Sequence, residues 1–444
     1  MSYSEGKRPF EAASKSNHIH LIKDKLVQEF LYNHELPRDS EEIETISSYY
    51  IDIDYDTKDS INWIVAVDGG NTTIPVKSKF PSSTLTFFQF GANALSIEDL
   101  NSLKEEPYIS PENISKLKEL HRRKLVIPTK NIGLKKEDGT RATLTFSVRK
   151  AIYDFFKNED LLETLSWFLF ESYNPANTKN NYELASHPDN IELKKIIIDK
   201  SKLTKDYCIN HPDGMIFLTD VFRLHEVIDD DFGAGGVLGY LTNIAEHFIL
   251  IDYVKNVYKR RKSALKEVLF IKDGPLGFFG QTANMHKPMR ALINYLSESE
   301  DIFIVGIEKS GPFVEHAMEI QDKLKPGQAY LFSNKYIYKY IKPGDINTTE
   351  PFGKTSYYGS KLIFKSRDEK IYLITLPTKT PEVVLNPQKE DFHNIDIILK
   401  YIEKLRSDMY DNSLLPIALA NKLVSLSDHP SSMILEKFAK SIIK

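Results

Sequence analysis

The sequence contains one cysteine, Cys208, among 444 residues, and it has no long apolar run. A lone cysteine rules out an internal disulfide framework and is typical of a reducing cytoplasm. No stretch approaches the roughly 18 consecutive apolar residues of a membrane span. The chain begins MSYSEGKR, which lacks the apolar core of a secretion signal. We therefore expect a cytoplasmic protein without a membrane span.

Two further absences limit the classes of function that the sequence allows. The formal net charge is −4, so the composition as a whole gives no electrostatic footprint for nucleic acid, although local basic patches remain compatible with it. The sequence also lacks the Gly-x-x-x-x-Gly-Lys-Ser/Thr loop with which P-loop ATPases bind phosphate. Any ATP-driven movement would therefore depend on a partner.

The sequence does contain two apolar runs that each end in Asp-Gly. Residues 63–67 lead to Asp68-Gly69, and residues 268–272 lead to Asp273-Gly274. A short, mostly β-branched run closed by Asp-Gly predicts a buried strand whose last residue emerges at the sheet edge. Two such carboxylates on neighbouring strands would form an acidic pocket that needs a cation. The pattern indicates metal-dependent chemistry, and phosphoryl chemistry first.

A two-metal phosphodiesterase site needs at least one more carboxylate from a separate element. Glu246 is the first candidate, because it lies in an otherwise apolar helix predicted from residue 237 to about 258, and a buried carboxylate requires a partner. A lysine or arginine would serve as that partner as well as a metal ion would. The rival set is the acidic run that precedes this helix, Glu226, Asp229, Asp230 and Asp231.

The order of elements favours a mixed α/β fold. Strand-like runs at 61–67, about 73–80 and 83–90 suggest consecutive hairpins, whereas later strands alternate with helices. We divide the chain into an N-terminal arm over residues 1–60, a first part of the core over 61–94, a mainly helical insertion over 95–212, and the remainder of the core with C-terminal helices over 213–444.

Taken in order, these motifs resemble the NurA nucleases, the partners of HerA-type hexameric ATPases. The resemblance extends from about residue 60 to about residue 430, with a poor match over 95–235. The motifs are Asp68-Gly69 after a strand, Ile244-Ala245-Glu246 on a helix, Asp273-Gly274-Pro275-Leu276 after a second strand, Val305-Gly306-Ile307-Glu308-Lys309-Ser310, and residues 416–423 (PIALANKL) in a final helix.

The resemblance implies an RNase H-like fold and a homodimeric, Mn²⁺- or Mg²⁺-dependent DNA nuclease that docks onto a HerA-type ring ATPase. The N-terminal arm of this chain would be a candidate docking element. The role of the nuclease would be DNA end processing in repair or antiviral defence. Carried over by position, Asp68, Glu246 and Asp273 would be the metal carboxylates. Lys309 would lie near the scissile phosphate.

The chain departs from the family at Asn421, where a histidine is usual. Asparagine is a weaker ligand and cannot carry a proton, so His393 or His429 would have to substitute. This departure leaves open a non-catalytic subunit that clamps DNA or regulates the ATPase. A third alternative is an actin-like or sugar-kinase-like ATPase, whose first phosphate loop resembles residues 68–73. The glycine-rich stretch at 233–236 precedes Asp273, which is the wrong order for that class.

The sequence contains two weaker signals of binding sites. Lys335, Tyr336, Tyr338 and Lys339 alternate aromatic and basic side chains in a segment predicted as a strand, where they could stack bases and hold phosphates. Cys208, His211 and His225 suggest a zinc knuckle, although the four ligands that such a site requires are not evident.

Overall fold

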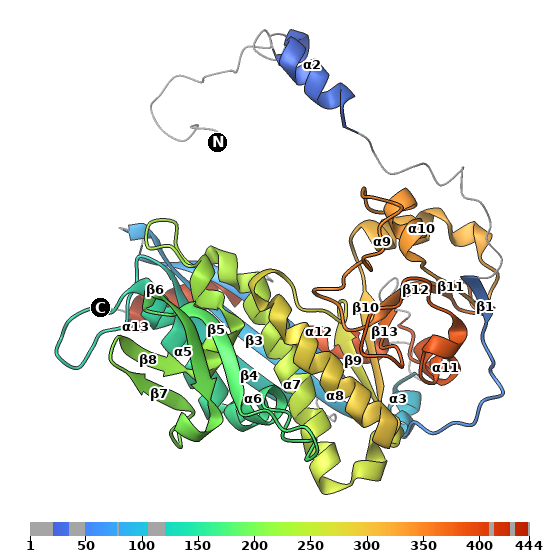
Figure 1. Cartoon of the computed structure of the whole chain (residues 1–444), viewed down its shortest axis with the longest axis horizontal. Coiled ribbons are helices and arrows are strands. Elements are labelled where there is room, and N and C mark those ends of the chain that lie inside the picture. Colours follow the sequence, from blue (N-terminus) through green and yellow to red (C-terminus); the bar gives the residue numbers. More distant parts are fainter. Residues whose placement is uncertain are drawn as a thin grey trace.

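The computed structural model describes residues 21–34, 49–77, 80–104, 120–407, 413–426 and 431–442. Its centre is a nine-stranded mixed sheet (Figure 1). In spatial order the strands are β1 (Tyr50–Asp52), β11 (Gln328–Leu331), β12 (Ser360–Lys365), β13 (Ile371–Leu376), β10 (Phe303–Glu308), β9 (Val268–Asp273), β2 (Trp63–Lys77), β3 (Phe80–Ser96) and β4 (Leu120–Lys130).

Five of these strands form the centre of the fold, and all of them except β4 contain runs that the sequence predicts as strands. β4, β3 and β2 are antiparallel neighbours, and β9 and β10 continue the sheet parallel to β2. An antiparallel meander of three strands followed by two parallel strands is the RNase H-like arrangement. The predicted mixed sheet flanked by helices is confirmed. Beyond β10, the antiparallel strands β13, β12, β11 and β1 extend the sheet.

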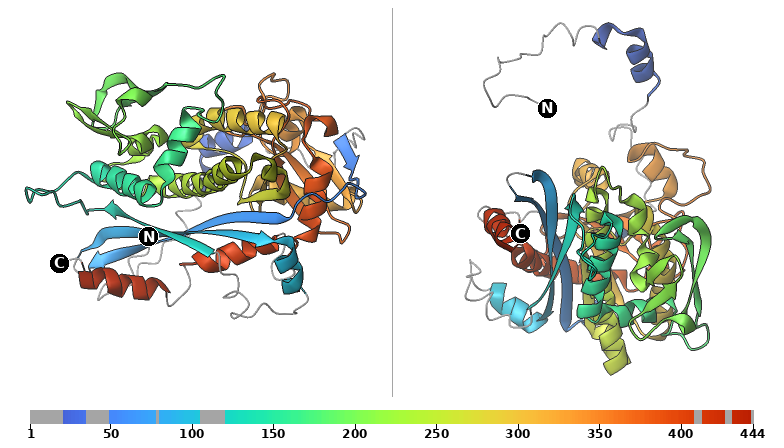
Figure 2. Two further views of the ribbon diagram at one scale, coloured as in Figure 1. Left: turned by 90° about the horizontal axis from the view of Figure 1, so that it is seen from below. Right: turned by 90° about the vertical axis from the view of Figure 1, so that its left-hand side faces the viewer.

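Helices cover both faces of the sheet, because successive side chains of a buried strand point to opposite faces. Val65 and Val67 pack into one core, whereas Ile64 and Ala66 pack into the other. Figure 2 shows helices on both faces of the sheet. The first face carries α5 (Leu144–Asn158), α6 (Leu161–Leu169), α7 (Leu238–Arg260), α8 (His286–Ser299), α9 (Pro312–Glu319) and α10 (Asn334–Tyr340). The second face carries α3 (Ile97–Lys104), α11 (Ile395–Lys404), α12 (Leu415–Val424) and α13 (Ser431–Ile442).

Strand β2 differs from its prediction. The sequence predicts a strand that ends at Asp68 and another at about 73–80, whereas β2 continues without a break from Trp63 to Lys77. Gly69 does not turn the chain. It makes room, since a Cβ there would lie 2.7 Å from the ring of Phe90. The glycine of the Asp-Gly pair therefore leaves room for the Phe90 ring of β3 within one long hairpin.

The segment 95–212, predicted as a mainly helical insertion, contains α5 and α6 but also strands. β4 from this segment lies at the edge of the main sheet. Two small hairpins follow the helices: β5 (Asn181–His187) pairs with β6 (Asn190–Asp199), and β7 (Cys208–His211) pairs with β8 (Gly214–Phe217). These short strands are rich in polar residues, so local pattern alone does not distinguish them from loops.

Helix α2 (Lys25–Tyr32) belongs to the predicted N-terminal arm and lies apart from the other elements (Figure 1). Asp24 caps it, because its Oδ1 accepts a hydrogen bond from the backbone N–H of Leu26 at 2.8 Å. No residue of α2 is buried, and Leu26, Phe30 and Leu31 are 62–75% exposed. Within the described ranges, no helix combines the length and the apolar character needed to span a membrane.

A buried ion network ties α5 to the small hairpins. Arg149 donates from Nε to Asp220 Oδ1 at 2.8 Å and from Nη1 to Asp189 Oδ1 at 2.6 Å. Arg149 and Asp220 are each 3% exposed. Removing one partner of such a pair leaves the other charge buried without compensation.

We expect Arg149→Met to lower the free energy of unfolding by about 3–5 kcal/mol, because Asp220 would keep its buried charge. Urea denaturation followed by circular dichroism measures the loss. Lys157→Met is the matched control on the same helix, since the Lys157–Asp206 pair is exposed and its loss should change nothing measurable. Equal stability of Arg149→Met and the wild-type protein would contradict the structural role of the network.

Candidate active site

Four chain segments bring acidic residues to one edge of the sheet. Asp68 lies within β2, Asp273 ends β9, Glu308 ends β10, and Glu246 projects from the middle of α7. The pairing of β2 with β9 stops at Val67 and Lys272, so the last strand residue of β9 lies beside Asp68. These carboxylates line an open cavity of about 290 Å³ together with Lys309. The predicted residues Asp68, Glu246, Asp273 and Lys309 therefore meet in one place.

Asp68 is the most constrained of these acids. It is 5% exposed, and its Oδ1 accepts a hydrogen bond from the backbone N–H of Gly69 at 2.8 Å. Its buried Oδ2 has no hydrogen-bond partner among the described residues. Burial and, to a lesser extent, the nearby carboxylate of Asp273 together raise the pKa of Asp68 to about 6, although Lys309 and Asn421 act in the opposite direction.

Glu246 is buried on α7 and accepts a hydrogen bond at its Oε2 from Lys272 Nζ at 2.8 Å. The alternative that the sequence left open, a lysine partner, is thus present. Burial raises the pKa of Glu246 to about 7 despite this lysine. Its second oxygen, Oε1, lies 3.1 Å from the place of a Cβ on Gly69, so only glycine there leaves room for the carboxylate.

Two lysines neutralise part of the acidic cluster. Lys272 Nζ also donates to the backbone carbonyl of Asp273 at 2.7 Å, and it is 2% exposed. Lys309 Nζ donates to Asp273 Oδ2 at 2.8 Å from the partly exposed side of the cavity. Because Lys309 is partly exposed, its ammonium group is accessible from the open side of the cavity.

Glu308 is a lining residue that the sequence reasoning missed. Its carboxylate contacts the buried ammonium of Lys361 and accepts a hydrogen bond from Thr375 Oγ1 at 3.2 Å. The sequence marks Glu308 only by its place at the end of an apolar strand, the same place that Asp273 occupies on β9. Lys272 was also missed. A lysine inside a buried strand indicates an acidic partner close by.

The donor set fits a divalent cation. Carboxylate oxygens are the ligands that Mg²⁺ and Mn²⁺ prefer, and the four carboxylates that line the cavity come from separate elements. The buried Oδ2 of Asp68 accepts no hydrogen bond among the described residues. In the present geometry, no three acidic, histidine or cysteine side chains of the described residues stand close enough to hold an ion. Binding would therefore require small side-chain shifts.

Asn421 lies beside Asp68 on α12 and influences its pKa, as its aligned position predicts. His393 does not substitute for a histidine there. It does not line the cavity, and its charged neighbours are Lys379 and Asp301. His429 lies outside the described residues.

The rival acidic run does not reach the cavity. Glu226 pairs with Arg223 at 2.6 Å, and Asp229 Oδ1 accepts hydrogen bonds from the backbone N–H groups of Asp231 and Phe232. These carboxylates shape a turn before α7. Asp230 has no place in the cavity lining.

The proposed zinc knuckle is not formed in the described part of the chain. Cys208 is buried, and its Sγ donates to the Asp206 carbonyl at 3.4 Å. The ring of His211 instead packs beside that of His187, with 4.7 Å between the ring centroids. His225 is buried.

The segment predicted as an aromatic strand is a helix. Ser333 caps α10 by accepting a hydrogen bond from the backbone N–H of Tyr336 at 3.2 Å. Tyr336 is only 4% exposed, and its hydroxyl hydrogen-bonds to His316 at 2.9 Å, so it cannot stack on a base. Tyr338 points elsewhere, toward Phe352. Lys335 and Lys339 remain accessible on the helix.

Comparisons with known proteins give one group of neighbours. No protein-family model matches the chain, and no curated protein matches it. Among solved structures, the NurA nuclease from Sulfolobus solfataricus is similar over 97% of this chain and 98% of its own, with 8% identity and a TM-score of 0.33. A second NurA structure covers 97% of this chain and 99% of its own at 12% identity and a TM-score of 0.33.

A third neighbour is a NurA structure bound to dAMP and manganese, at 12% identity and a TM-score of 0.28, with 97% of this chain and 98% of that chain covered. These neighbours belong to the family that the order of motifs resembles. At such identities and TM-scores the likeness does not decide an activity. The function is inferred from the side-chain geometry of the cavity.

The raised pKa values predict how the metal-free protein responds to pH. A carboxyl that keeps its proton to about pH 6 or 7 in the folded state, as Asp68 and Glu246 do, loses that proton near pH 4 when unfolded. The associated stability is fully present below about pH 4 and is lost as the pH rises through about 6 to 7. We expect a loss on the order of a few kcal/mol between pH 5 and 8, measured by urea denaturation in EDTA.

Saturating Mn²⁺ should flatten this pH dependence, because the bound cation favours the ionised carboxylates. Asp68→Asn provides the control, since it removes one of the two titrating groups and should reduce the slope without metal. A stability profile that is flat or rises between pH 5 and 8 in EDTA would contradict the shared burial of these carboxyls.

Proposed function

We propose that the chain is a divalent-metal-dependent DNA nuclease whose active site is the cavity between β2, β9, β10 and α7. One observation carries the proposal: four carboxylates from separate elements line one cavity, and a buried oxygen of Asp68 has no hydrogen-bond partner among the described residues. The neighbouring lysines neutralise this cluster only in part, and the remaining buried negative charge is costly unless a further cation joins it. Hydrolysis of a phosphodiester is the chemistry for which such clusters hold metal ions.

Each side chain has a distinct part in this proposal. Asp68, Glu246 and Asp273 would hold the divalent ion, Mn²⁺ or Mg²⁺, which when bound lowers the pKa of water and stabilises charge on the leaving oxygen. Lys309, 32% exposed, is placed to exchange its contact with Asp273 for a contact with the substrate phosphate.

Two further residues support these ligands. Lys272 fixes the orientation of the Glu246 carboxylate through a buried hydrogen bond. The Asn421 side chain lies beside Asp68 and favours its ionised form. Glu308, held by Lys361 and Thr375, adds negative charge at the same edge.

Asp68→Asn should lower Mn²⁺-dependent cleavage of linear DNA by about a thousandfold, because the amide cannot supply the ligand charge. Asp273→Asn should have a similar effect. The measurement is the initial rate of nucleotide release from labelled DNA with Mn²⁺, with circular dichroism to show that the fold is intact. Asp138→Asn, an exposed loop residue, is the control. Normal rates in both active-site variants would reject this site.

A non-catalytic DNA-clamping or regulatory subunit is the second candidate. It is favoured by Asn421, which cannot shuttle a proton, and by the lysine contacts that already satisfy Glu246 and Asp273. Purified protein that binds DNA but releases no nucleotide with Mn²⁺, alone or with its ATPase partner, would favour this candidate.

The proposal extends to partners. The chain lacks a P-loop, so we propose that it acts as a homodimer beside a HerA-type hexameric ATPase that moves the DNA, in end processing or antiviral defence. α2 supports a docking role for the N-terminal arm, because its apolar side chains are exposed on a helix that stands apart from the sheet.

Deletion of residues 1–34 should abolish co-elution with the ATPase in size-exclusion chromatography while Mn²⁺-dependent cleavage persists. The physical reason is that the deletion removes exposed apolar surface and no residue of the sheet or the cavity. Phe30→Asp is the finer test, since it places a charge on the apolar side chains of α2. Unchanged co-elution of both variants would show that docking uses another surface.

A further inference from the structure

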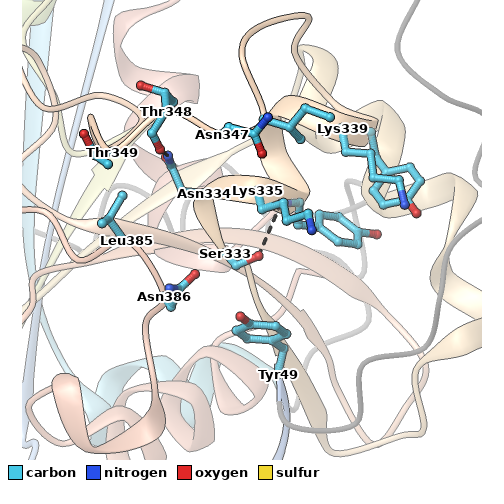
Figure 3. Close-up of a pocket in the computed structure, with 13 residues that line it drawn as sticks. Tyr49, Ser333, Asn334, Lys335, Lys339, Asn347, Thr348, Thr349, Leu385 and Asn386 are labelled. Atoms are coloured by element: carbon cyan, nitrogen blue, oxygen red, sulfur yellow. Dashed lines mark hydrogen bonds between the residues drawn. The ribbon is translucent and has the colours of Figure 1, made fainter.

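A second cavity of about 420 Å³ lies beside α10, away from the acidic site (Figure 3). Its volume falls within the range of small-molecule sites. We call it the α10 pocket. Its lining consists of aromatic, amide, hydroxyl and basic side chains without any aspartate or glutamate: Tyr49, Ser333, Asn334, Lys335, Tyr336, Lys339, Tyr340, Ile346, Asn347, Thr348, Thr349, Leu385 and Asn386. The pocket is therefore positive, whereas the other cavity is acidic.

Two lysines supply this charge. Lys335 and Lys339 lie one turn apart on α10, and neither forms an ion pair within the described ranges. The ammonium of Lys339 lies 4.8 Å from the centre of the Tyr340 ring. Two neighbouring ammonium groups with no carboxylate between them favour an anionic ligand, and a phosphate suits their point charges.

Aromatic rings border the same space. Tyr49 is half-buried, and Figure 3 shows its ring below Ser333, on the side of the pocket where Asn386 also lies. The rings of Tyr336 and Tyr340 lie on the buried side of α10, with 4.9 Å between their centroids. The half-buried Tyr49 ring, held edge-on against Tyr330 with 6.3 Å between the ring centroids, provides a face at the pocket on which a planar heterocycle can stack.

Amide groups complete the lining. Asn347 and Asn386 are exposed at the rim, and their side-chain amides have no hydrogen-bond partner among the described residues. Asn334 behaves differently, because it uses both ends of its amide to hold the loop that carries Asn347. It donates to the Glu350 carbonyl at 3.1 Å and accepts from the Phe352 N–H at 2.7 Å. Free amides on an anchored loop can pair with the polar edge of a base.

The α10 pocket lies on the same side of the sheet as Glu308. Glu308 pairs in register with Leu373, which aligns through Ile363 with Tyr330 on β11, directly before α10. Three strand spacings of about 4.8 Å separate β10 from β11. A smaller cavity lined by Asn334 and Lys361 lies between the two sites, and Lys361 contacts Glu308. This smaller cavity, of about 20 Å³, has room for about one water and admits no nucleotide. A strand that contacts both sites would therefore have to cross the surface over the few strand spacings that separate them.

We propose that the α10 pocket binds one nucleoside monophosphate unit, with the base against Tyr49 and the phosphate on Lys335 and Lys339. The choice of a nucleotide over other aromatic anions rests on the proposed nuclease function. The unit is either a free mononucleotide, such as a product of cleavage, or one nucleotide of a single DNA strand. Both have the same stacking and phosphate chemistry.

The test measures binding without catalysis. Asp68→Asn protein in EDTA is titrated with dAMP and with a 5′-phosphorylated five-nucleotide single strand by isothermal calorimetry, so that neither metal nor cleavage contributes. We expect Tyr49→Ala to weaken binding about tenfold, as loss of one stacking ring does. Lys335→Glu with Lys339→Glu should weaken it at least about tenfold as well. Lys325→Glu, an exposed lysine outside the pocket, is the matched control.

The two probes distinguish the source of the nucleotide. Equal affinity for dAMP and the strand assigns the pocket to mononucleotides, whereas tighter binding of the strand assigns it to DNA. No binding of either probe would overturn the proposal, as would competition by inorganic phosphate at the same affinity as dAMP. If the wild-type protein shows no Mn²⁺-dependent cleavage while this binding is observed, the nuclease is rejected and the pocket is kept, so the two failures can be told apart.

Discussion

The placement of Asp68 is the constraint on which the site depends. This carboxylate is held at the point where β9 stops pairing with β2, and one of its oxygens is buried without a partner among the described residues. A buried carboxylate destabilises the fold unless it is protonated or paired with a cation. The ionised carboxylate of Asp68 therefore carries a free-energy cost in the folded protein, and the surrounding residues reduce this cost without removing it.

The lysines around the cavity neutralise part of the acidic cluster. Lys272 is buried and binds Glu246, while Lys309 is more exposed and binds Asp273. Their burial suits them to different parts, because an exposed lysine exchanges partners at low cost whereas a buried one does not. Lys272 therefore acts as a fixed structural charge. Under the proposed function, the more exposed Lys309 would exchange Asp273 for a substrate phosphate.

The sheet also separates two kinds of surface. The edge at β2, β9 and β10 is acidic, and the α10 pocket beyond β11 is basic and aromatic. An anionic polymer is repelled by the first surface unless a metal is bound, and it is attracted by the second. Under the proposed function, the second surface would hold the strand and the metal-loaded first surface would cut it.

The sequence by itself indicated two buried strands, one apolar helix and the three acids that they carry. The apolar runs before Asp68 and Asp273 and the apolar helix around Glu246 indicated buried carboxylates, because burial and charge conflict wherever they occur. The local pattern could not show that β2 passes through Asp68, since a glycine required for close approach to Phe90 has the same appearance as a glycine in a turn.

Only the tertiary structure decided which groups meet. Glu308 and Lys272 entered the site through strand register, and the aromatic segment near Tyr336 became a helix because of its serine cap and its inward packing. Tyr49 and Lys335 are far apart in the chain and border one pocket only because β1 pairs with β11. Contacts of this kind depend on long-range pairing, which leaves no trace in local periodicity.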